Sequence, residues 1–262
     1  MNRAVGIIPA RWSSTRFPGK PLHIIAGKPL LQRVFERCRQ AKNLDSVIVA
    51  TDDMRIAEAA FKWGAEVALT SSKHGSGTDR VAEVARKAKQ FAFVINIQGD
   101  EPLVDPRLID KLVQELRSDR TFAIITAAHP FEDPEDALSP HQVKVVLDLH
   151  GNALYFSRTP IPDSRSNGHK AGGDARGRKS RRSLFLRHQG IYGFRRPMLL
   201  QFVKWKATPL ERAESLEQLR ALENGVKVHV LITAKGSPGI DTLADAEALE
   251  QKLVRAERKV VR

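Results

Sequence analysis

Short, continuously apolar runs alternate with stretches of helical periodicity over the first half of the chain. An apolar run without polar alternation is typical of a strand in a parallel sheet that is covered on both faces. Strands alternating with helices predict an α/β fold with a doubly wound, mostly parallel sheet. The expected strands are Ala4–Ile8, Val47–Thr51, Glu66–Leu69 and Phe93–Ile97, and the expected helices are Pro29–Gln40, Met54–Trp63, Gly77–Lys89 and Pro106–Leu116.

The pattern changes after about Ile124, where antiparallel strands and short helices are expected. We therefore predict a core built from residues 1–128 and 226–262, with a smaller α+β lobe, 129–225, inserted into it. The expected elements are two strands within Val143–Arg158 around a His-Gly-Asn turn, a strand at His188–Phe194, helices at Pro197–Lys206 and Pro209–Asn224, a strand at Val226–Ile232 and a final helix from Asp241/Thr242 to about Arg258.

The composition is that of a globular protein. The chain has 262 residues, of which 42% are hydrophobic, and this is enough to bury a sizeable core. No apolar run approaches the roughly 20 residues that cross a bilayer, and the N-terminus does not have the pattern of a secretory signal. The single cysteine, Cys38, cannot form a disulfide within the chain. We therefore expect a cytoplasmic protein without a membrane span.

The net charge of +13 raises the alternative of a nucleic-acid-binding protein. Much of that charge lies in one segment, Asp163–Arg187, which holds eight Lys or Arg residues and two Asp residues. This segment is rich in Gly and Ser and nearly free of apolar residues, so we expect a flexible basic loop. Aromatic residues make up 6% of the chain and no aromatic RNA-binding motif is present. The composition therefore favours the interpretation that the protein does not bind nucleic acid.

The segment Ala4–Leu22, AVGIIPARWSSTRFPGKPL, has three cationic residues in a loop directly after an expected strand. Arg11 and Arg16 can bind phosphate oxygens in a fork, and Lys20 can act as a point charge. The segment matches neither the Walker loop nor the dinucleotide-binding glycine motif. We predict a triphosphate site, with a loop of ordinary solvated cations as the alternative.

Two acidic residues follow expected strands. Asp100 lies in Gln98-Gly99-Asp100, directly after an apolar run, and Asp241 lies in GIDT, directly before the last helix. A carboxylate at a strand end, beside a glycine that permits close approach, can hold Mg²⁺ against a phosphate. For Asp241 the alternative is a helix cap.

The stretch HGSGTDR, His74–Arg80, immediately precedes or begins a helix. The free N–H groups there, with Ser76, can bind an anion or hydrogen-bond a base. The alternative is a simple helix cap formed by Thr78 or Asp79.

Eight short motifs follow one another in the order found in the 3-deoxy-manno-octulosonate cytidylyltransferase family, whose members are also called CMP-Kdo synthetases. The chain resembles this family over nearly its whole length. Each motif alone has modest specificity, whereas the series of eight is highly specific. The motifs are IPARWSSTRFPGKPL, VATDD, SGTDR, NIQGDEP, LYFSR, RHQGIYGF, SLEQLRALENG and GIDT.

The resemblance implies a Rossmann-like nucleotidyltransferase fold and transfer of CMP from CTP to 3-deoxy-D-manno-octulosonate (Kdo), with release of pyrophosphate, for lipopolysaccharide biosynthesis. It also implies Mg²⁺ as the cofactor and a homodimer formed through the inserted lobe. No residue stands out as a general base.

The resemblance assigns roles to residues at matching positions. Lys20, Arg11, Asp100 and Asp241 would be catalytic, the two aspartates as Mg²⁺ ligands. The nucleotide-binding residues would be Arg11, Arg16, Lys20, Ser76 and Gln98, and the sugar-binding residues would be Arg80, Gln98, Arg158, His188, Tyr192, Glu217 and Gln218.

Three departures from the family pattern concern the sugar side. Asp79 stands where Glu is commoner, Gln189 stands where an apolar residue is usual, and the Asp163–Arg187 loop is longer and more basic than expected. A related acid sugar, such as 8-amino-Kdo or a sialic-acid-like sugar, is therefore the alternative substrate.

Overall fold

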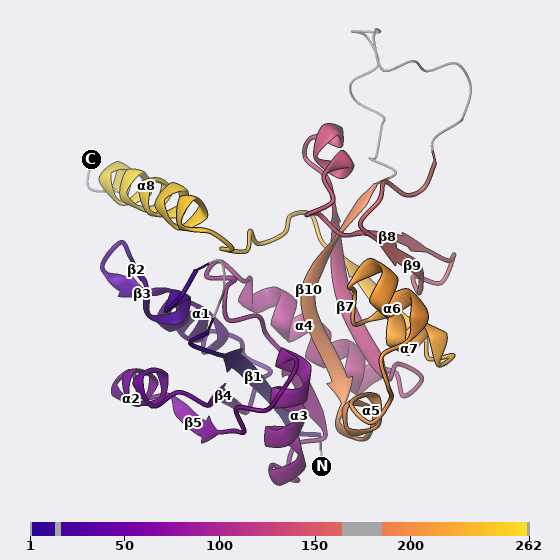
Figure 1. The fold of residues 1–262 in the computed structure, drawn as a ribbon, viewed down its shortest axis with the longest axis horizontal. Helices are drawn as coiled ribbons and strands as arrows, with labels where there is room; N and C mark the ends of the chain where they lie inside the picture. Colours follow the sequence, from indigo (N-terminus) through magenta and orange to yellow (C-terminus); the bar gives the residue numbers. More distant parts are fainter. Residues whose placement is uncertain (1, 14–16, 164–184, 261–262) are drawn as a thin grey trace, which may run out of the picture. The chain divides into compact units, whose positions relative to one another are not determined.

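The computed structural model describes residues 2–13, 17–163 and 185–260, which form two compact units. The first unit comprises Met1–Ala123, Ile191–Lys204 and Ser237–Arg262, and the second comprises Ile124–Gly190 and Trp205–Gly236. Figure 1 shows the elements of both units. Arg16 and most of the predicted basic loop lie outside the described residues.

The first unit contains the parallel sheet that the apolar runs predict. The sheet order is β10-β6-β1-β4-β5, in which β6, β1, β4 and β5 are parallel and β10 is antiparallel to β6. Pro9 in β1 is in register with Ala50 in β4, so the parallel strands end at one edge. The bounds are β1 Ala4–Ala10, β4 Ser46–Thr51, β5 Glu66–Leu69, β6 Phe93–Asn96 and β10 Leu186–Arg195.

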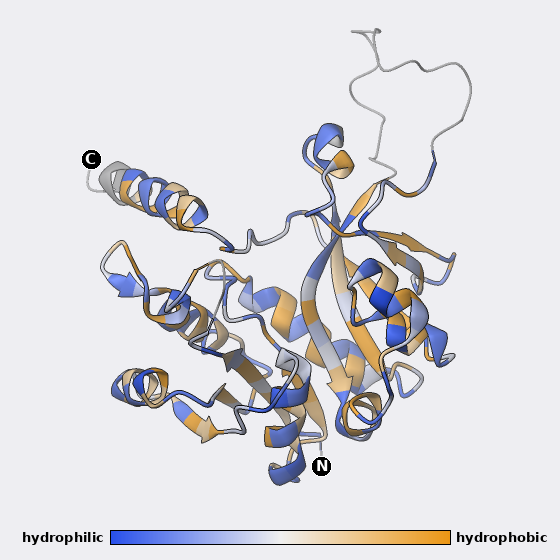
Figure 2. Ribbon diagram, in the orientation of Figure 1, coloured by the Kyte–Doolittle hydropathy of each residue, from blue (hydrophilic) through white to orange (hydrophobic). Residues whose placement is uncertain are grey.

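Helices cover both faces of this sheet (Figure 1). One face is covered by α1 (Leu30–Cys38) and α4 (Pro106–Ser118), which pack together, and the other by α3 (Gly77–Lys87) and α5 (Arg196–Phe202). Another helix, α2 (Met54–Lys62), contacts β4 and β5. Figure 2 shows hydrophobic and hydrophilic residues alternating along α4. Its residues Leu112, Val113 and Leu116 are fully buried, as an amphipathic helix on a sheet requires.

The first unit also has a small hairpin and the C-terminal helix. A 3-10 turn, η1 (Lys20–Leu22), leads into the hairpin of β2 (Ile24–Ile25) and β3 (Lys28–Pro29). The C-terminal helix α8 (Leu243–Val260) contacts β2.

The second unit combines a parallel and an antiparallel pair of strands. β7 (Ile124–Pro130) pairs in parallel with β11 (Val228–Ile232), and β8 (Lys144–Leu147) pairs antiparallel with β9 (Ala153–Ser157). The first residues of β10 pair with β8. The unit also contains η2 (Pro134–Leu138), α6 (Pro209–Glu214) and α7 (Leu219–Glu223). No helix in the described ranges is both long and apolar enough to span a membrane.

The α/β fold with a mostly parallel sheet is confirmed, and the predicted strands of the first unit agree with the structure to within two residues at each end. The single helix predicted over Pro209–Asn224 is wrong. The structure has two helices there, because Ser215 adopts a left-handed conformation with φ of 53° that ends α6. The strand predicted at Val226–Ile232 is β11, which pairs with β7 in the second unit. The division into a core and an inserted lobe stays a prediction.

Candidate functional site

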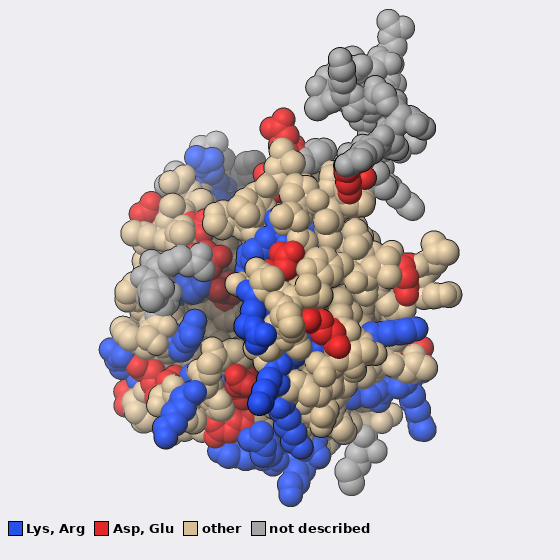
Figure 3. All heavy atoms as spheres, turned by 45° about the vertical axis from the view of Figure 1, so that its right-hand side comes forward, with Lys and Arg blue, Asp and Glu red and all other residues tan. Residues whose placement is uncertain are grey.

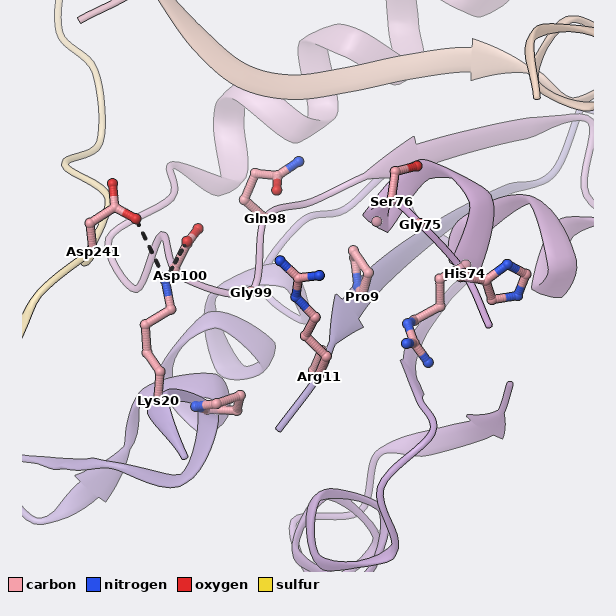
Figure 4. Close-up of a pocket in the computed structure, with 14 residues that line it drawn as sticks. Pro9, Arg11, Lys20, His74, Gly75, Ser76, Gln98, Gly99, Asp100 and Asp241 are labelled. Carbon is pink, nitrogen blue, oxygen red and sulfur yellow. Dashed lines mark hydrogen bonds and ion pairs between the residues drawn. The ribbon is translucent and has the colours of Figure 1, made fainter. Parts of the chain in front are cut away.

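A pocket lies at the edge of the first unit's sheet where β1 and β6 end (Figure 4). Loops after these strands, the start of α3 and the segment before α8 contribute its walls. The residues that line the pocket are Pro9, Ala10, Arg11, Lys20, Pro21, His74, Gly75, Ser76, Gly77, Arg80, Gln98, Gly99, Asp100 and Asp241.

On one side of this pocket, the ammonium group of Lys20 contacts two carboxylates and a backbone carbonyl. Its Nζ donates to Oδ2 of Asp100 at 2.7 Å and to the backbone carbonyl of Ile240 at 2.8 Å, and it lies 3.9 Å from Oδ1 of Asp241. Figure 4 shows both carboxylates pointing toward this ammonium group. Segments more than 200 residues apart in sequence thus meet at one cation.

Arg11 follows β1 and projects into the same pocket, where its exposed side chain adds a second positive charge (Figure 4). The neighbouring Trp12 packs elsewhere: the guanidinium of Arg55 lies 3.6 Å from its ring centroid. Gly19, with φ of 71°, turns the chain back beside the Trp12 ring. The pocket therefore contains Arg11 and Lys20, whereas the Trp12 ring packs against Gly19 and Arg55.

Gly99 brings the loop after β6 against the end of β1. A Cβ atom at this position would lie 2.9 Å from the backbone oxygen of Pro9, closer than such atoms approach in proteins. The close approach of the two backbones therefore explains why a glycine stands beside Asp100. Gln98 and Asp100 flank this contact and both line the pocket.

Ser76 caps α3, so the cap is not formed by Thr78 or Asp79, which were the residues named in the alternative to a binding role. The Ser76 Oγ accepts a hydrogen bond from the Asp79 backbone N–H at 3.1 Å and donates to its Oδ2 at 3.0 Å. Likewise, Thr242 rather than Asp241 caps α8: its Oγ1 accepts from the backbone N–H of Asp245 at 3.2 Å.

Arg80 lines the pocket, but its guanidinium group is held by neighbouring side chains. Nη2 lies 3.0 Å from Oδ1 of Asp52, and Nη1 donates to Oγ1 of Thr70 at 2.5 Å. The residue is 4% exposed. Its contacts therefore join α3 to the loops after β4 and β5.

The other predicted sugar-binding residues belong to different parts of the chain. Tyr192 lies in the first unit, on β10 opposite Asn96, and its ring is 6.0 Å from that of Phe194. The second unit contains Arg158, His188, Glu217 and Gln218.

Arg158 is held by backbone oxygens. Its Nε donates to the carbonyl of Glu214 at 2.8 Å and its Nη1 to the carbonyl of Pro140 at 3.2 Å, while the Glu214 carboxylate accepts from the Arg158 backbone N–H at 2.9 Å. The adjacent Lys144 is fully buried and donates to the carbonyls of Ser139, Gln142 and Arg158. Burial lowers the pKa of Lys144.

His188 and Gln218 have sheltered polar groups. The His188 Nε2 lies 2.9 Å from Oγ1 of Thr126, and the His188 ring packs edge-on against Phe156. Desolvation lowers the pKa of His188 well below its usual value. The buried Nε2 of Gln218 has no hydrogen-bond partner among the described residues.

Comparison with known proteins gives a consistent result. The cytidylyltransferase family model matches residues 5–228. The 3-deoxy-manno-octulosonate cytidylyltransferase of Geobacter metallireducens is 45% identical over 253 residues, which cover 97% of this chain and 98% of the relative. The chain belongs to the 3-deoxy-manno-octulosonate cytidylyltransferase family.

Two further comparisons agree with this family. The 3-deoxy-manno-octulosonate cytidylyltransferase of Geobacter sulfurreducens is 47% identical over 247 residues, covering 94% of this chain and 98% of the relative. A solved structure of CMP:2-keto-3-deoxy-manno-octonic acid synthetase complexed with CTP is 38% identical with a TM-score of 0.86, covering 97% and 99% of the two chains. The resemblance that the eight motifs indicate is confirmed.

The family's nucleotide chemistry makes the acidic pair in the pocket a candidate Mg²⁺ site. Among the described residues, no cluster of three or more His, Cys, Asp or Glu side chains is arranged to hold a metal ion. Mg²⁺ paired with phosphates needs only one or two protein carboxylates. Asp100 and Asp241 supply two, and both already face the cation of Lys20. The donor set fits Mg²⁺.

His74 also lines the pocket, and no sequence motif gives it a role. Its Nε2 lies 2.7 Å from Oε2 of Glu83 on α3, and the same carboxylate accepts from the Ser71 backbone N–H at 2.9 Å. The bonds from Ser71, His74 and Lys87, with Ser71 contributing most, lower the pKa of Glu83 to about 2. The pair fastens the loop before Ser76 to α3. The nine-residue spacing of His74 and Glu83 carries no sequence signal that would have revealed the contact.

Proposed function

We propose that this chain transfers CMP from CTP to Kdo, giving CMP-Kdo and pyrophosphate for lipopolysaccharide biosynthesis. The observation that carries this proposal is the meeting of Lys20 with Asp100 and Asp241 in a pocket that also contains Arg11, in a chain of this family. Cations and metal-binding carboxylates at one edge of a parallel sheet suit a nucleoside triphosphate.

On this proposal, Arg11, Arg16 and Lys20 bind the triphosphate. Their charge would stabilise the negative charge that builds up on the departing pyrophosphate. Ser76 and Gln98 would position the cytidine. Because the Ser76 hydroxyl is occupied by Asp79 as a helix cap, we expect the backbone around Ser76 to contribute to this binding as well.

Asp100 and Asp241 would hold Mg²⁺. When bound there, the ion would supply positive charge to the phosphate oxygens and lower the pKa of the attacking hydroxyl. Before substrate binds, Lys20 offsets one of the two negative charges, which reduces the repulsion between Asp100 and Asp241 and leaves a net negative charge to attract a metal ion.

The sugar would be bound by Arg80, Gln98, Arg158, His188, Tyr192, Glu217 and Gln218, with Arg80 or Arg158 facing its carboxylate. The anomeric hydroxyl would attack the α-phosphorus in line with the departing pyrophosphate. Such reactions depend mainly on orientation and electrostatics, so the chain needs no covalent intermediate.

We further propose that the protein is cytoplasmic and acts as a homodimer formed through residues 129–225. The lone Cys38 is fully buried, as a structural thiol in a reducing compartment would be. Figure 3 shows Lys and Arg side chains gathered in the middle and lower part of one face, with Asp and Glu side chains beside them. Small-molecule substrates remain the proposed partners, because no aromatic RNA-binding motif accompanies this charge.

The proposal is tested by measuring pyrophosphate release with CTP and Kdo, with each substrate omitted in turn. We expect release only when both are present, and CMP-Kdo as the product by mass spectrometry. A panel of CTP, UTP and ATP with Kdo, 8-amino-Kdo and N-acetylneuraminate ranks the substrates by kcat/KM. A higher kcat/KM with another acid sugar would overturn the choice of Kdo.

The same preparation is titrated with heteropolymer RNA and DNA at increasing salt concentration. We expect weak binding that does not compete with CTP. Tight binding with a steep salt dependence, together with no pyrophosphate release, would favour the nucleic-acid alternative.

A further inference from the structure

We infer that Glu250 on α8 is a positioning residue for Asp241. Its contact with the β2–β3 hairpin fixes the C-terminal segment, and this segment delivers Asp241 to the pocket. The inference rests on the proposed role of Asp241 as a Mg²⁺ ligand.

The first observation concerns Ile240, the residue before Asp241. Its carbonyl accepts from Nζ of Lys20 at 2.8 Å, and its backbone N–H donates to the carbonyl of Asp100 at 2.9 Å. The backbone of Ile240 is thus tied to the two other charged residues of the acidic site. Any shift of Ile240 would move Asp241 relative to Asp100.

The second observation is that the side chain of Ile240 is 2% exposed and belongs to a small hydrophobic cluster. That cluster joins α8 to the segment from the first loop to α1, and burial of its side chains favours the docked helix. Its buried members are Phe17, Ile25, Leu30, Ile240, Ala246 and Leu249.

The third observation is the polar contact at the far end of this cluster. Oε1 of Glu250 accepts the backbone N–H of Ala26 at 2.7 Å. Ala26 has a positive φ of 44°, an unfavourable conformation for alanine, so this turn needs external support. Arg33 on α1 provides part of it by donating to the carbonyls of Ile25 and Ala26.

Asp241 itself is not fixed by burial, since its side chain is 54% exposed. Its position depends on the residues on either side of it: Ile240 in the cluster, and α8, whose Asp245 carboxylate accepts the Asp241 backbone N–H at 3.0 Å. The bond between Glu250 and Ala26 holds α8 in this arrangement. Loss of that bond would allow the segment with Asp241 to move away from Lys20 and Asp100.

The test is titration of the whole chain with Mn²⁺, in the presence of CTP and without sugar, followed by the loss of the free Mn²⁺ signal in electron paramagnetic resonance. Because CTP also binds Mn²⁺, a matched titration of CTP alone is subtracted, and the protein's contribution is the additional loss. Glu250→Ala removes the acceptor, whereas Glu250→Gln removes the charge and keeps an oxygen that can accept from Ala26. Glu247→Ala, an exposed glutamate on the same helix, controls for charge. CTP affinity without metal and the urea midpoint are measured for each variant.

We expect Glu250→Ala to weaken Mn²⁺ binding by about tenfold, the lower end of the range for groups that orient metal ligands. Glu250→Gln and Glu247→Ala should remain within about twofold of the parent chain, and CTP affinity without metal should be unchanged. Equal loss in Glu250→Ala and Glu250→Gln would mean that charge alone is responsible, and would overturn the inference.

Unchanged Mn²⁺ affinity in Glu250→Ala would also overturn it, even if the urea midpoint falls, since a purely structural role lowers stability without changing metal binding by the folded chain. Absence of Mn²⁺ binding by the parent chain would instead contradict the metal proposal itself. The two failures are therefore distinguishable.

Discussion

Two groups of charged residues, one in each unit, differ in the partners of their cationic side chains. In the first unit, Lys20 is paired mainly with the carboxylates of Asp100 and Asp241, beside an open pocket. In the second unit, Lys144 and Arg158 donate to backbone carbonyls. A carboxylate beside an open pocket can exchange its lysine partner for a metal ion when substrate binds. A buried backbone carbonyl keeps its lysine or arginine partner, because the fold fixes its position. The first arrangement suits chemistry, whereas the buried carbonyl contacts of Lys144 suit the architecture of the chain around it.

The largest effect is expected from Lys20→Ala. If Lys20 acts on the leaving phosphates, kcat/KM should fall by about 10²- to 10³-fold, as it does when one stabilising donor is removed from an active site. The urea midpoint should also fall, because the Lys20 side chain is 16% exposed and its loss leaves Asp100 and Asp241 without the cation between them, so kcat/KM is compared for the folded chain only. The measurement is steady-state pyrophosphate release, with Lys62→Ala, an exposed lysine at the end of α2, as the control. Near-normal turnover in Lys20→Ala would remove the distinction between the two groups.

Lys144→Met should mainly lower stability rather than kcat/KM. Three carbonyls lose their donor in a buried site, so the free energy of unfolding should fall by about 3 kcal/mol. Urea denaturation measures this loss, with Lys227→Met, an exposed lysine of the same unit, as the control. If kcat/KM for CTP fell as much as it does in Lys20→Ala while stability held, the structural role of Lys144 would be refuted.

Gly99→Ala tests whether the close backbone contact shapes the pocket. The added Cβ would meet the Pro9 oxygen at 2.9 Å, so strain should lower stability by about 1–3 kcal/mol and raise KM for CTP. Gly239→Ala is the matched control, because nothing lies within 4 Å of its added Cβ. Equal KM values for the two variants would show that the contact does not position the pocket.

The smallest effect concerns pH and His188. Its pKa is lowered in the folded chain, so the unfolded chain binds the proton more readily. The stability that depends on neutral His188 is therefore present above the ordinary pKa of about 6.5 and is lost as pH falls below it, with a slope approaching about 1.4 kcal/mol per pH unit. Urea titrations between pH 7 and pH 5 should show a shallower slope in His188→Gln than in the parent chain. Identical slopes would mean that His188 is protonated in the folded chain as readily as in the unfolded one.

The sequence predicts the first unit well because its strands are continuously apolar. Val47–Thr51, for example, differs from the observed β4 by one residue. The second unit was less predictable. The interruption between α6 and α7 is at Ser215, where no glycine or proline marks a break. β7, Ile124–Pro130, was not predicted as a strand, although its apolar run was visible.

The contacts of the candidate site also differ in how well the sequence predicts them. Lys20, Asp100 and Asp241 were predicted because each follows or precedes a recognisable element, and the structure brings these three residues together. The hydrogen bond between Glu250 and Ala26 is not predictable from the sequence, because the two residues are 224 positions apart. Its donor is a backbone N–H, which every residue except proline has. The same holds for the carbonyls around Lys144, since backbone acceptors leave no mark in the amino-acid sequence.

The order of the segments has a consequence for biosynthesis. The first unit is assembled from three stretches of chain, and the last of these carries Ile240 and Asp241. A nascent chain still missing this stretch can form the strands and the cationic loop, yet it lacks one wall of the pocket. Ribosome-attached intermediates should therefore be catalytically silent until the stretch with Ile240 and Asp241 has left the ribosome and packed against the first unit.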